Sequence, residues 1–167
     1  MALVLDGTGS MTFGNGAISG LSNAAIPSTK IGAGAILQVV QATTVTQATI
    51  SATSFTATSL TASITPISSA SKILVFANGT VLGNQVSCQP VYTIYRGSTN
   101  LGDSARGFGQ VYSASNAIDA MGTMQYLDSP ATTASTTYTV YMKVNLGTGV
   151  WGHDSGTQVM TLMEIAG

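Results

Sequence analysis

Apolar and polar residues alternate along much of the chain after residue 35. In TTYTVYMKVN, residues 136–145, one set of alternate positions holds Tyr138, Val140, Met142 and Val144. The positions between them hold threonine, tyrosine and lysine. A period of two is typical of a strand with one buried face. The pattern therefore predicts a strand that points those four side chains toward a core.

Other segments rich in β-branched and aromatic residues predict more strands. Residues 36–65 are dense in threonine, valine and isoleucine, which suit a pleated surface. We expect two long strands there, at about 36–48 and 53–65, ended by Pro66. KILVFAN at 72–78 is a continuous apolar run ended by Asn-Gly, so it predicts a central strand buried on both faces. Further strands are expected at 90–103 (strand, turn and short return strand), 107–113, 119–128, 136–145 and 157–166.

Amphipathic helices are not indicated, because no long window has a convincing apolar period of 3.6 residues. Turn residues separate the expected strands at Asp128-Ser129-Pro130, Gly147-Thr148-Gly149 and His153-Asp154-Ser155-Gly156. Many short strands spaced by turns are typical of an antiparallel β-sandwich. The predicted fold class is therefore all-β, a jelly-roll-like antiparallel β-sandwich over residues 36–167.

The first 35 residues have a different character. Gly-x-Gly elements alternate with isolated apolar residues, and Asp6 is the only charged residue among the first twenty. We expect residues 1–35 to form an extended N-terminal arm, which at ~3.3 Å per residue would reach about 115 Å. Its apolar side chains would anchor it on partner chains. These anchors are Leu3, Val4, Leu5, Met11, Phe13, Ile18, Leu21, Ile26 and Ile31.

Charge is scarce throughout the 167 residues. Charged residues make up 7% of the chain, against about 25% in typical soluble domains, and the net charge is −1. The electrostatic attraction that nucleic acids or anionic membranes require is missing, so neither is an expected partner. Edge strands and a neutral surface favour association. We therefore expect much of the surface to lie against other chains.

Few residues indicate chemistry. Cys88 is the only cysteine and no Cys/His cluster is found, so a small buried side chain and no metal or cofactor are expected. In WGHDSG the only histidine, His153, stands beside Asp154 and Ser155. Consecutive side chains diverge and cannot converge as a catalytic triad does, so we interpret the segment as a surface turn. The scattered aspartates are expected to cap turns, and no enzyme is predicted.

Aromatic residues offer a second kind of site. Tyr92, Tyr95, Phe108, Tyr112, Tyr126 and Trp151 are expected mainly in the core or at subunit contacts. An exposed minority, of which the candidates are Tyr112, Tyr126 and Trp151, would be able to stack on a glycan. No basic residues are interleaved with them, which argues against nucleic acid.

Several segments of the sequence resemble those of a known protein family. They are GAGAILQVVQATT, SLTASITPISSASKILVFANG, YRGSTNLG, QYLDSPATTASTTYTVYMK and TLMEIAG, within residues 32–167. They are similar to small β-rich virion structural proteins, tail-fibre-like or capsid-decoration proteins, of tailed phages, notably cyanophages. The segment LVLDGTGSMTFGNGAISG is likewise similar to the starts or shafts of phage fibre proteins. No catalytic residues accompany the resemblance.

The resemblance implies a protein on the virion exterior, made in the bacterial host cytoplasm. Because the chain is short, we expect a capsid decoration (cement) protein that bridges capsomers. It would act as a homotrimer, with the major capsid protein as its other partner. The alternative is a short tail fibre or tip that contacts tail proteins and binds host surface glycan. A third hypothesis is a polysaccharide hydrolase that depends on His153.

Overall fold

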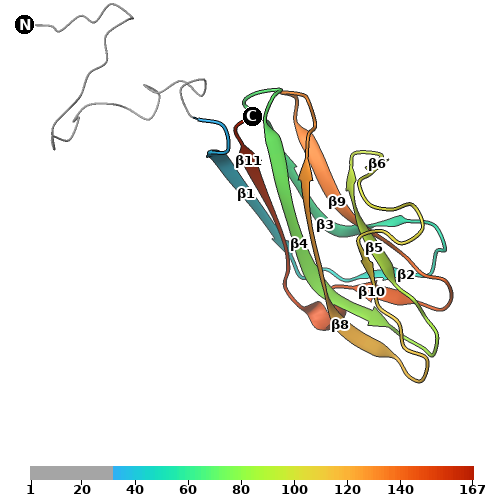
Figure 1. The fold of residues 1–167 in the computed structure, drawn as a ribbon. Coiled ribbons are helices and arrows are strands. Elements are labelled where there is room, and N and C mark those ends of the chain that lie inside the picture. The colour runs from blue at the N-terminus through green and yellow to red at the C-terminus, as the bar shows by residue number, and fades with distance from the viewer. Residues whose placement is uncertain (1–31) are drawn as a thin grey trace, which may run out of the picture.

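The computed structural model describes residues 32–167, so the nine arm anchors lie outside the described residues. The described chain is nearly all β, and two antiparallel sheets pack face to face as a sandwich (Figure 1). The predicted antiparallel β-sandwich is confirmed. The helical structure among these residues is one three-residue turn, η2 (His153–Ser155). No helix in residues 32–167 is long and apolar enough to cross a bilayer.

Each sheet is built from strands that are distant in sequence. Sheet A contains β1 (Ile36–Thr44), β11 (Gln158–Ile165), β4 (Lys72–Gly83), β8 (Ile118–Asp128), β10 (Gly149–Trp151) and β2 (Ala48–Ile50). Sheet B contains β3 (Thr56–Ile64), β9 (Thr136–Lys143), β5 (Val91–Arg96), β6 (Thr99–Asn100) and β7 (Gly109–Gln110). In sheet A, β4 pairs with β11 and β10 on one side and with β8 on the other.

The strand order is that of a jelly roll. In sheet A the order is β1-β11-β4-β8, so the first long strand pairs with the last. In sheet B the order is β3-β9-β5, followed by the short strands β6 and β7 on the free side of β5. Successive long strands therefore alternate between the sheets in two Greek-key windings, which defines a jelly roll.

The core lies between the sheets and follows the alternation of the sequence. Tyr138, Val140 and Met142 are fully buried, and Val144 is nearly so, as predicted for residues 136–145. Strand β4 contributes alternate residues such as Ile73 and Val75 from the opposite sheet. The isolated Cys88 is buried, which confirms its predicted role as a small core residue.

Two predicted strands differ in the structure, and one strand is additional. The strand expected at 36–48 is divided into β1 and β2 by residues 45–47. The strand expected at 107–113 is only the two residues of β7. Strand β10 was not predicted, because its residues follow the Gly147-Thr148-Gly149 turn signal.

The largest correction concerns the apolar run at 72–78. Asn78-Gly79 does not end the strand, since β4 continues to Gly83 and pairs with β8 along its length. Burial alternates along β4, so it covers the core with one face and leaves the other face half-buried. The prediction of burial on both faces was therefore wrong.

The aspartates divide into two groups. Asp103 closes a loop as expected, because its carboxylate accepts hydrogen bonds from the amides of Ala105 and Arg106 at 2.8 and 2.6 Å. These bonds lower the pKa of Asp103, the one from Arg106 most. Asp128, by contrast, is buried and does not cap a turn. Its partners, Arg96 and Tyr138, lie on the opposite sheet.

The start of the described chain is tied to the C-terminal end. The amide of Ala35 donates to the carbonyl of Gly32, which closes a turn in which Gly34 has φ +88°. Gly34 also donates to Ala166, and Ala166 donates to Ala35. Residues 32–35, where the described chain starts, therefore lie at the end of sheet A where β1 begins and β11 ends.

Candidate functional site

The outer face of sheet A carries an apolar row that crosses four strands. Val39 pairs with Met163, Met163 with Leu74, and Leu74 with Leu127. Their chain neighbours point into the core, so these four side chains point away from it. Val39 is 53% exposed and Leu127 is 47% exposed, and the two central residues are half-buried. We refer to these four residues as the apolar row.

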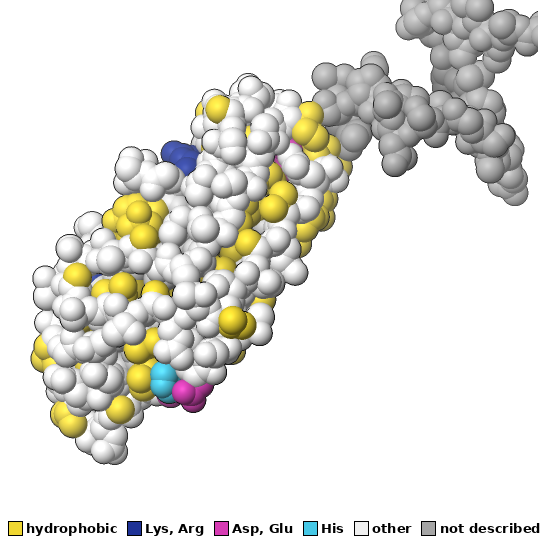
Figure 2. Space-filling view, turned by 180° about the vertical axis from the view of Figure 1, so that it is seen from behind, with side chains coloured by type: hydrophobic (Ala, Val, Ile, Leu, Met, Phe, Trp, Pro, Cys, Tyr) yellow, Lys and Arg dark blue, Asp and Glu magenta, His cyan; other side chains and the backbone are white. Residues whose placement is uncertain are grey.

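The surroundings of the apolar row carry little charge, and Lys72, which pairs with Ile165, is the cation next to it. Ile36 and Ile165 pair beside it, near the turn where the described chain begins. On its other side Phe76 lies between Thr161 and Gln125. Lys72 and Asp119 lie toward opposite ends of the face, and the outward positions between them hold apolar, hydroxyl and amide side chains. On the face of the molecule seen in Figure 2, charged side chains are likewise few.

The β1 edge of sheet A carries no charge. Strand β1 has β11 on one side and no strand on the other within the described chain. Its nine residues, ILQVVQATT, include no charge and no proline, and the register of its pairing with β11 shifts once, between Ile36 and Gln38. Charge, proline and bulges are the usual means of keeping an edge strand from pairing with another chain. An uncharged edge next to an apolar face can therefore associate with another polypeptide.

The three aromatic residues that were predicted to stack on a ligand do not lie together in the structure. Tyr112 is 52% exposed and Tyr126 is 36% exposed, but Trp151 is 0% exposed. The expectation of an exposed Trp151 was wrong. Tyr126 packs against Phe108 with ring centroids 5.4 Å apart, whereas Tyr112 has no aromatic partner within residues 32–167. These residues do not form one binding surface.

An aromatic cluster that the sequence did not predict lies on the outer side of sheet B. The rings of Tyr95 and Tyr141 stack with centroids 3.9 Å apart, and Phe55 meets Tyr95 edge-on at 6.2 Å. The Lys143 ammonium lies 4.4 Å from the centre of the Phe55 ring. Alternation in β9 would have placed Tyr141 and Lys143 on one face, but no local signal brings Phe55 to them.

His153 lies in the surface turn that the sequence predicted. Its Nδ1 is 2.9 Å from Asp119 Oδ2, and its Nε2 is 3.4 Å from Asp154 Oδ1. A catalytic histidine needs a nucleophile on one nitrogen, but here carboxylates face both. The three side chains lie within metal-binding reach of one another. Both aspartates are exposed, and exposed acidic groups often lie together without binding a metal ion.

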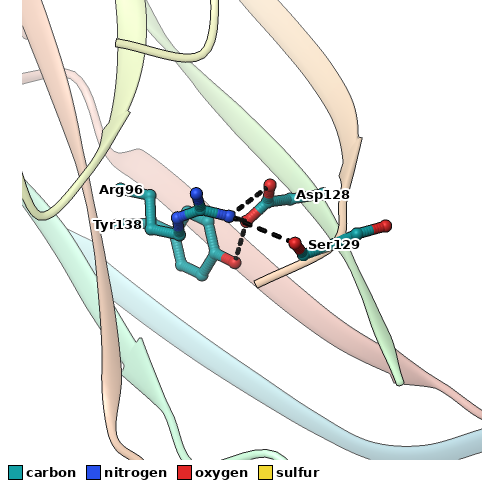
Figure 3. A network of polar contacts seen from close by, with 4 residues as sticks. All are labelled: Arg96, Asp128, Ser129 and Tyr138. Carbon is teal, nitrogen blue, oxygen red and sulfur yellow. Dashed lines mark hydrogen bonds and ion pairs between the residues drawn. The ribbon is translucent and has the colours of Figure 1, made fainter. Parts of the chain in front are cut away.

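Asp128 holds the two sheets together through a buried polar network (Figure 3). Arg96 Nη1 donates to both carboxylate oxygens at 2.8 and 2.9 Å, and the Tyr138 hydroxyl donates at 2.7 Å. Burial, followed by the hydrogen bond and the charge of Asp128, raises the pKa of Tyr138 well above its ordinary value. Tyr138 therefore stays protonated as a donor, and the network is structural.

Glu164 is a second buried carboxylate, on the inner side of β11. Gln38 donates to it from β1, and the amide of Ile67 donates at 2.8 Å. Burial raises the pKa of Glu164, but hydrogen bonds, among them those from Gln38 and the amide of Ile67, outweigh it, so the pKa is lowered overall. The carboxylate ties the start of β1 to the segment after β3.

Comparisons with known proteins add no assignment. No protein-family model matches the chain, and no curated protein matches it. The resemblance to phage virion proteins therefore stays a prediction, and any functional conclusion depends on the surfaces described above. Of these, the outer face of sheet A is the broadest.

Proposed function

We propose that this chain is a non-enzymatic structural protein on the exterior of a tailed-phage particle, acting as a capsid decoration or cement protein. It assembles as a homotrimer and bridges neighbouring copies of the major capsid protein. Its mechanism is mechanical, because each bridge raises the free energy needed to separate capsomers under the pressure of packaged DNA. The resemblance in sequence and the apolar row on the outer face of sheet A support this function.

The apolar row is the observation that carries the proposal. Four strands at ~4.8 Å spacing and nine residues at ~3.3 Å give the face about 19 Å by 30 Å, or roughly 570 Å². A standard protein interface buries about 800 Å² per partner, so this face supplies most of one. Its occupant must also be nearly uncharged, because an unpaired charge buried there would be costly. A second copy of this chain meets that condition.

The expected arm fits the same scheme. The described chain starts at Gly32, close to the pair Ile36 and Ile165 at one end of sheet A. The expected arm of residues 1–35 would extend from this end and reach past the subunit interface to a neighbouring capsomer. Its isolated apolar residues, including Leu3, Met11 and Phe13, would recover the entropy lost on ordering by contact with partner chains.

Localisation in the particle tests the function. We expect cryo-electron microscopy of the phage that encodes this chain to show hundreds of copies on the head, at positions between capsomers. A handful of copies at the tail would overturn the decoration role and favour the tail-fibre alternative. Absence from purified particles would overturn both virion assignments.

The mass of the purified full-length chain tests the trimer separately. Three chains of 16.9 kDa give a particle of about 51 kDa, which sedimentation equilibrium distinguishes from a monomer. A concentration-independent monomer would contradict the proposed homotrimer. Because particle localisation does not depend on this result, the two parts of the proposal can fail independently.

A further inference from the structure

An open pocket lies at one end of sheet B, away from the apolar row. Its volume is about 410 Å³. The pocket is lined by Thr53, by Gln89 and Val91, by Ala105 and Arg106, and by residues 143–145 at the end of β9 and in the turn after it. This volume is within the range of small-ligand sites in proteins, about 300–1,000 Å³. Val91, Ala105 and Val144 supply its apolar surface, which is larger than its polar surface, and the other lining side chains are polar or charged.

The walls of the pocket are fixed by backbone contacts. Asp103 and Gly107 exchange hydrogen bonds that close the loop carrying Arg106. At Gly107, φ is +59° and a Cβ would lie 2.3 Å from the carbonyl oxygen of Tyr92, so only glycine fits there. On the other wall, the amide of Val144 donates to Ala52 and holds the 51–55 segment against β9. The walls of the pocket therefore have this arrangement without a bound ligand.

Two cations meet at this pocket. The described chain has four lysine and arginine residues, and two of them, Arg106 and Lys143, line it. Within residues 32–167 neither forms a salt bridge, although both charges interact electrostatically with the Asp103 carboxylate. The Asp103 carboxylate is already engaged by the amides of its own loop. The local balance is thus positive on a surface that is otherwise almost neutral.

Both cations are oriented by neutral partners. Lys143 Nζ donates to the carbonyl of Ser104 at 3.1 Å and lies over the Phe55 ring. Arg106 Nη1 donates to Gln110 Oε1 at 2.9 Å. Each head group keeps further N–H donors for another acceptor, because lysine has three and arginine five. A carboxylate or similar oxyanion between them would complete the arrangement with charge-assisted hydrogen bonds.

We propose that the Arg106–Lys143 pocket binds a carboxylate-bearing sugar, a uronic acid residue of a polysaccharide. The two cations hold the carboxylate, and the hydroxyl of Thr53 and the amide of Gln89 bind the ring hydroxyls. This binding activity goes beyond the proposed decoration role and does not depend on it. A particle covered with the protein would present the pocket in many copies, so weak single-site affinity would be raised by multivalency.

A saccharide fits better than an acidic peptide. A peptide segment is usually held by main-chain hydrogen bonds to a sheet edge or by a deep apolar groove. The pocket opens between two loops and the end of β9, and its apolar surface is confined to Val91, Ala105 and Val144. Hydroxyl and amide groups next to cations match a polyhydroxylated acid instead.

Titration of the ¹⁵N-labelled full-length chain with oligogalacturonate tests the proposal. We expect shifts at Arg106, Lys143 and Gln89, and weaker or no binding of the same oligomer after methyl esterification, which removes only the charge. Arg106→Gln and Lys143→Gln should each lower the affinity about three- to tenfold. Lys72→Gln, which removes a cation from sheet A, should leave the affinity unchanged.

Three results would overturn the proposal. The first is no shift of the pocket residues at millimolar oligogalacturonate, and the second is equal binding of the acid and the ester. The third is stronger binding of a poly-glutamate peptide than of the oligosaccharide, which would assign the pocket to an acidic protein partner. Arg106 lies on an exposed loop, so Arg106→Gln remains informative even if Lys143→Gln weakens the fold.

Discussion

Gly79 and Trp151 fit together so closely that a side chain on Gly79 would collide with the indole. A Cβ built at Gly79 lies 2.9 Å from Trp151 Cε2. Gly122, which pairs with Gly79 across β4 and β8, would place its own Cβ 2.9 Å from Trp151 Cζ3. The indole of β10 is therefore seated against two facing glycines, and this explains both the continuous strand at Asn78-Gly79 and the burial of the tryptophan.

Gly79→Ala should destabilise the protein by about 1–3 kcal/mol, the usual cost of overpacking a core. The effect would appear as a lower midpoint in urea-induced unfolding. Gly32→Ala is the matched control, because a Cβ there has no atom within 4 Å. Equal stability of the two variants would contradict the packing described for Trp151.

Trp151 is the only tryptophan of the chain, so its fluorescence reports on one site. Because the side chain is fully buried against Tyr92 and the two glycines, we expect blue-shifted emission and little quenching by acrylamide. Unfolding in urea should shift the emission to the red and restore quenching. Strong quenching of the folded protein would contradict the burial of Trp151.

Asp128→Asn should cost about 2–3 kcal/mol, because it leaves Arg96 without its charge partner and weakens the bond from Tyr138. Tyr138→Phe should cost about 1 kcal/mol, since it removes a single hydrogen bond. Calorimetric melting of both variants measures these losses. Asp154→Asn changes an exposed carboxylate, so its free energy of unfolding should stay within about 0.5 kcal/mol of the wild-type value. A larger loss at Asp154 would show that the loss at Asp128 is not specific to the buried network.

Acid should weaken the fold through Glu164. Its pKa in the folded protein lies below the ordinary value of 4.5, so the unfolded chain binds a proton more readily than the folded one. The stabilisation that Glu164 gives the folded state is therefore fully present at pH values above that ordinary pKa. It is lost as the pH falls through the pKa of the folded state. We expect the free energy of unfolding to decline as the pH falls below the ordinary value of 4.5.

Glu164→Gln separates this effect from that of other carboxyls. The pKa of Asp103 is lowered as well, so the wild-type slope contains both contributions. The stability difference between wild type and Glu164→Gln should shrink as the pH falls, and urea unfolding at several pH values measures it. A difference that is constant with pH would show that the carboxylate is not preferentially ionised in the folded state.

Met163→Asp tests the apolar row. If the row is buried between copies, one charge in its centre should raise the dissociation constant of the oligomer roughly tenfold or more. Sedimentation measures the change, and circular dichroism checks that the sheet is intact. Thr137→Glu adds the same charge to the exposed outer side of sheet B, and equal dissociation by the two variants would show that the row is not the interface.

Much of the fold could be predicted from the sequence, but the binding surfaces could not. Alternation in residues 136–145 correctly assigned the inward positions, because a strand repeats every two residues whatever its partner. The same alternation exists in β4 and β11, yet the apolar row requires knowing that Met163 pairs with Val39 and Leu74. The Arg106–Lys143 pocket likewise joins residues from segments that have no common sequence signal.

What the sequence determined by itself is local: strands where β-branched residues alternate, turns where glycine and aspartate gather, an uncharged surface and a buried Cys88. These features depend on backbone preference and hydrophobicity, which act over a few residues. Only the tertiary structure decided that Asn78-Gly79 lies inside a strand, that Trp151 is buried, and that Asp128 bonds to Arg96 and Tyr138 on the opposite sheet. Each of these depends on which strand lies next to or across from which, and that is fixed by packing the whole sandwich.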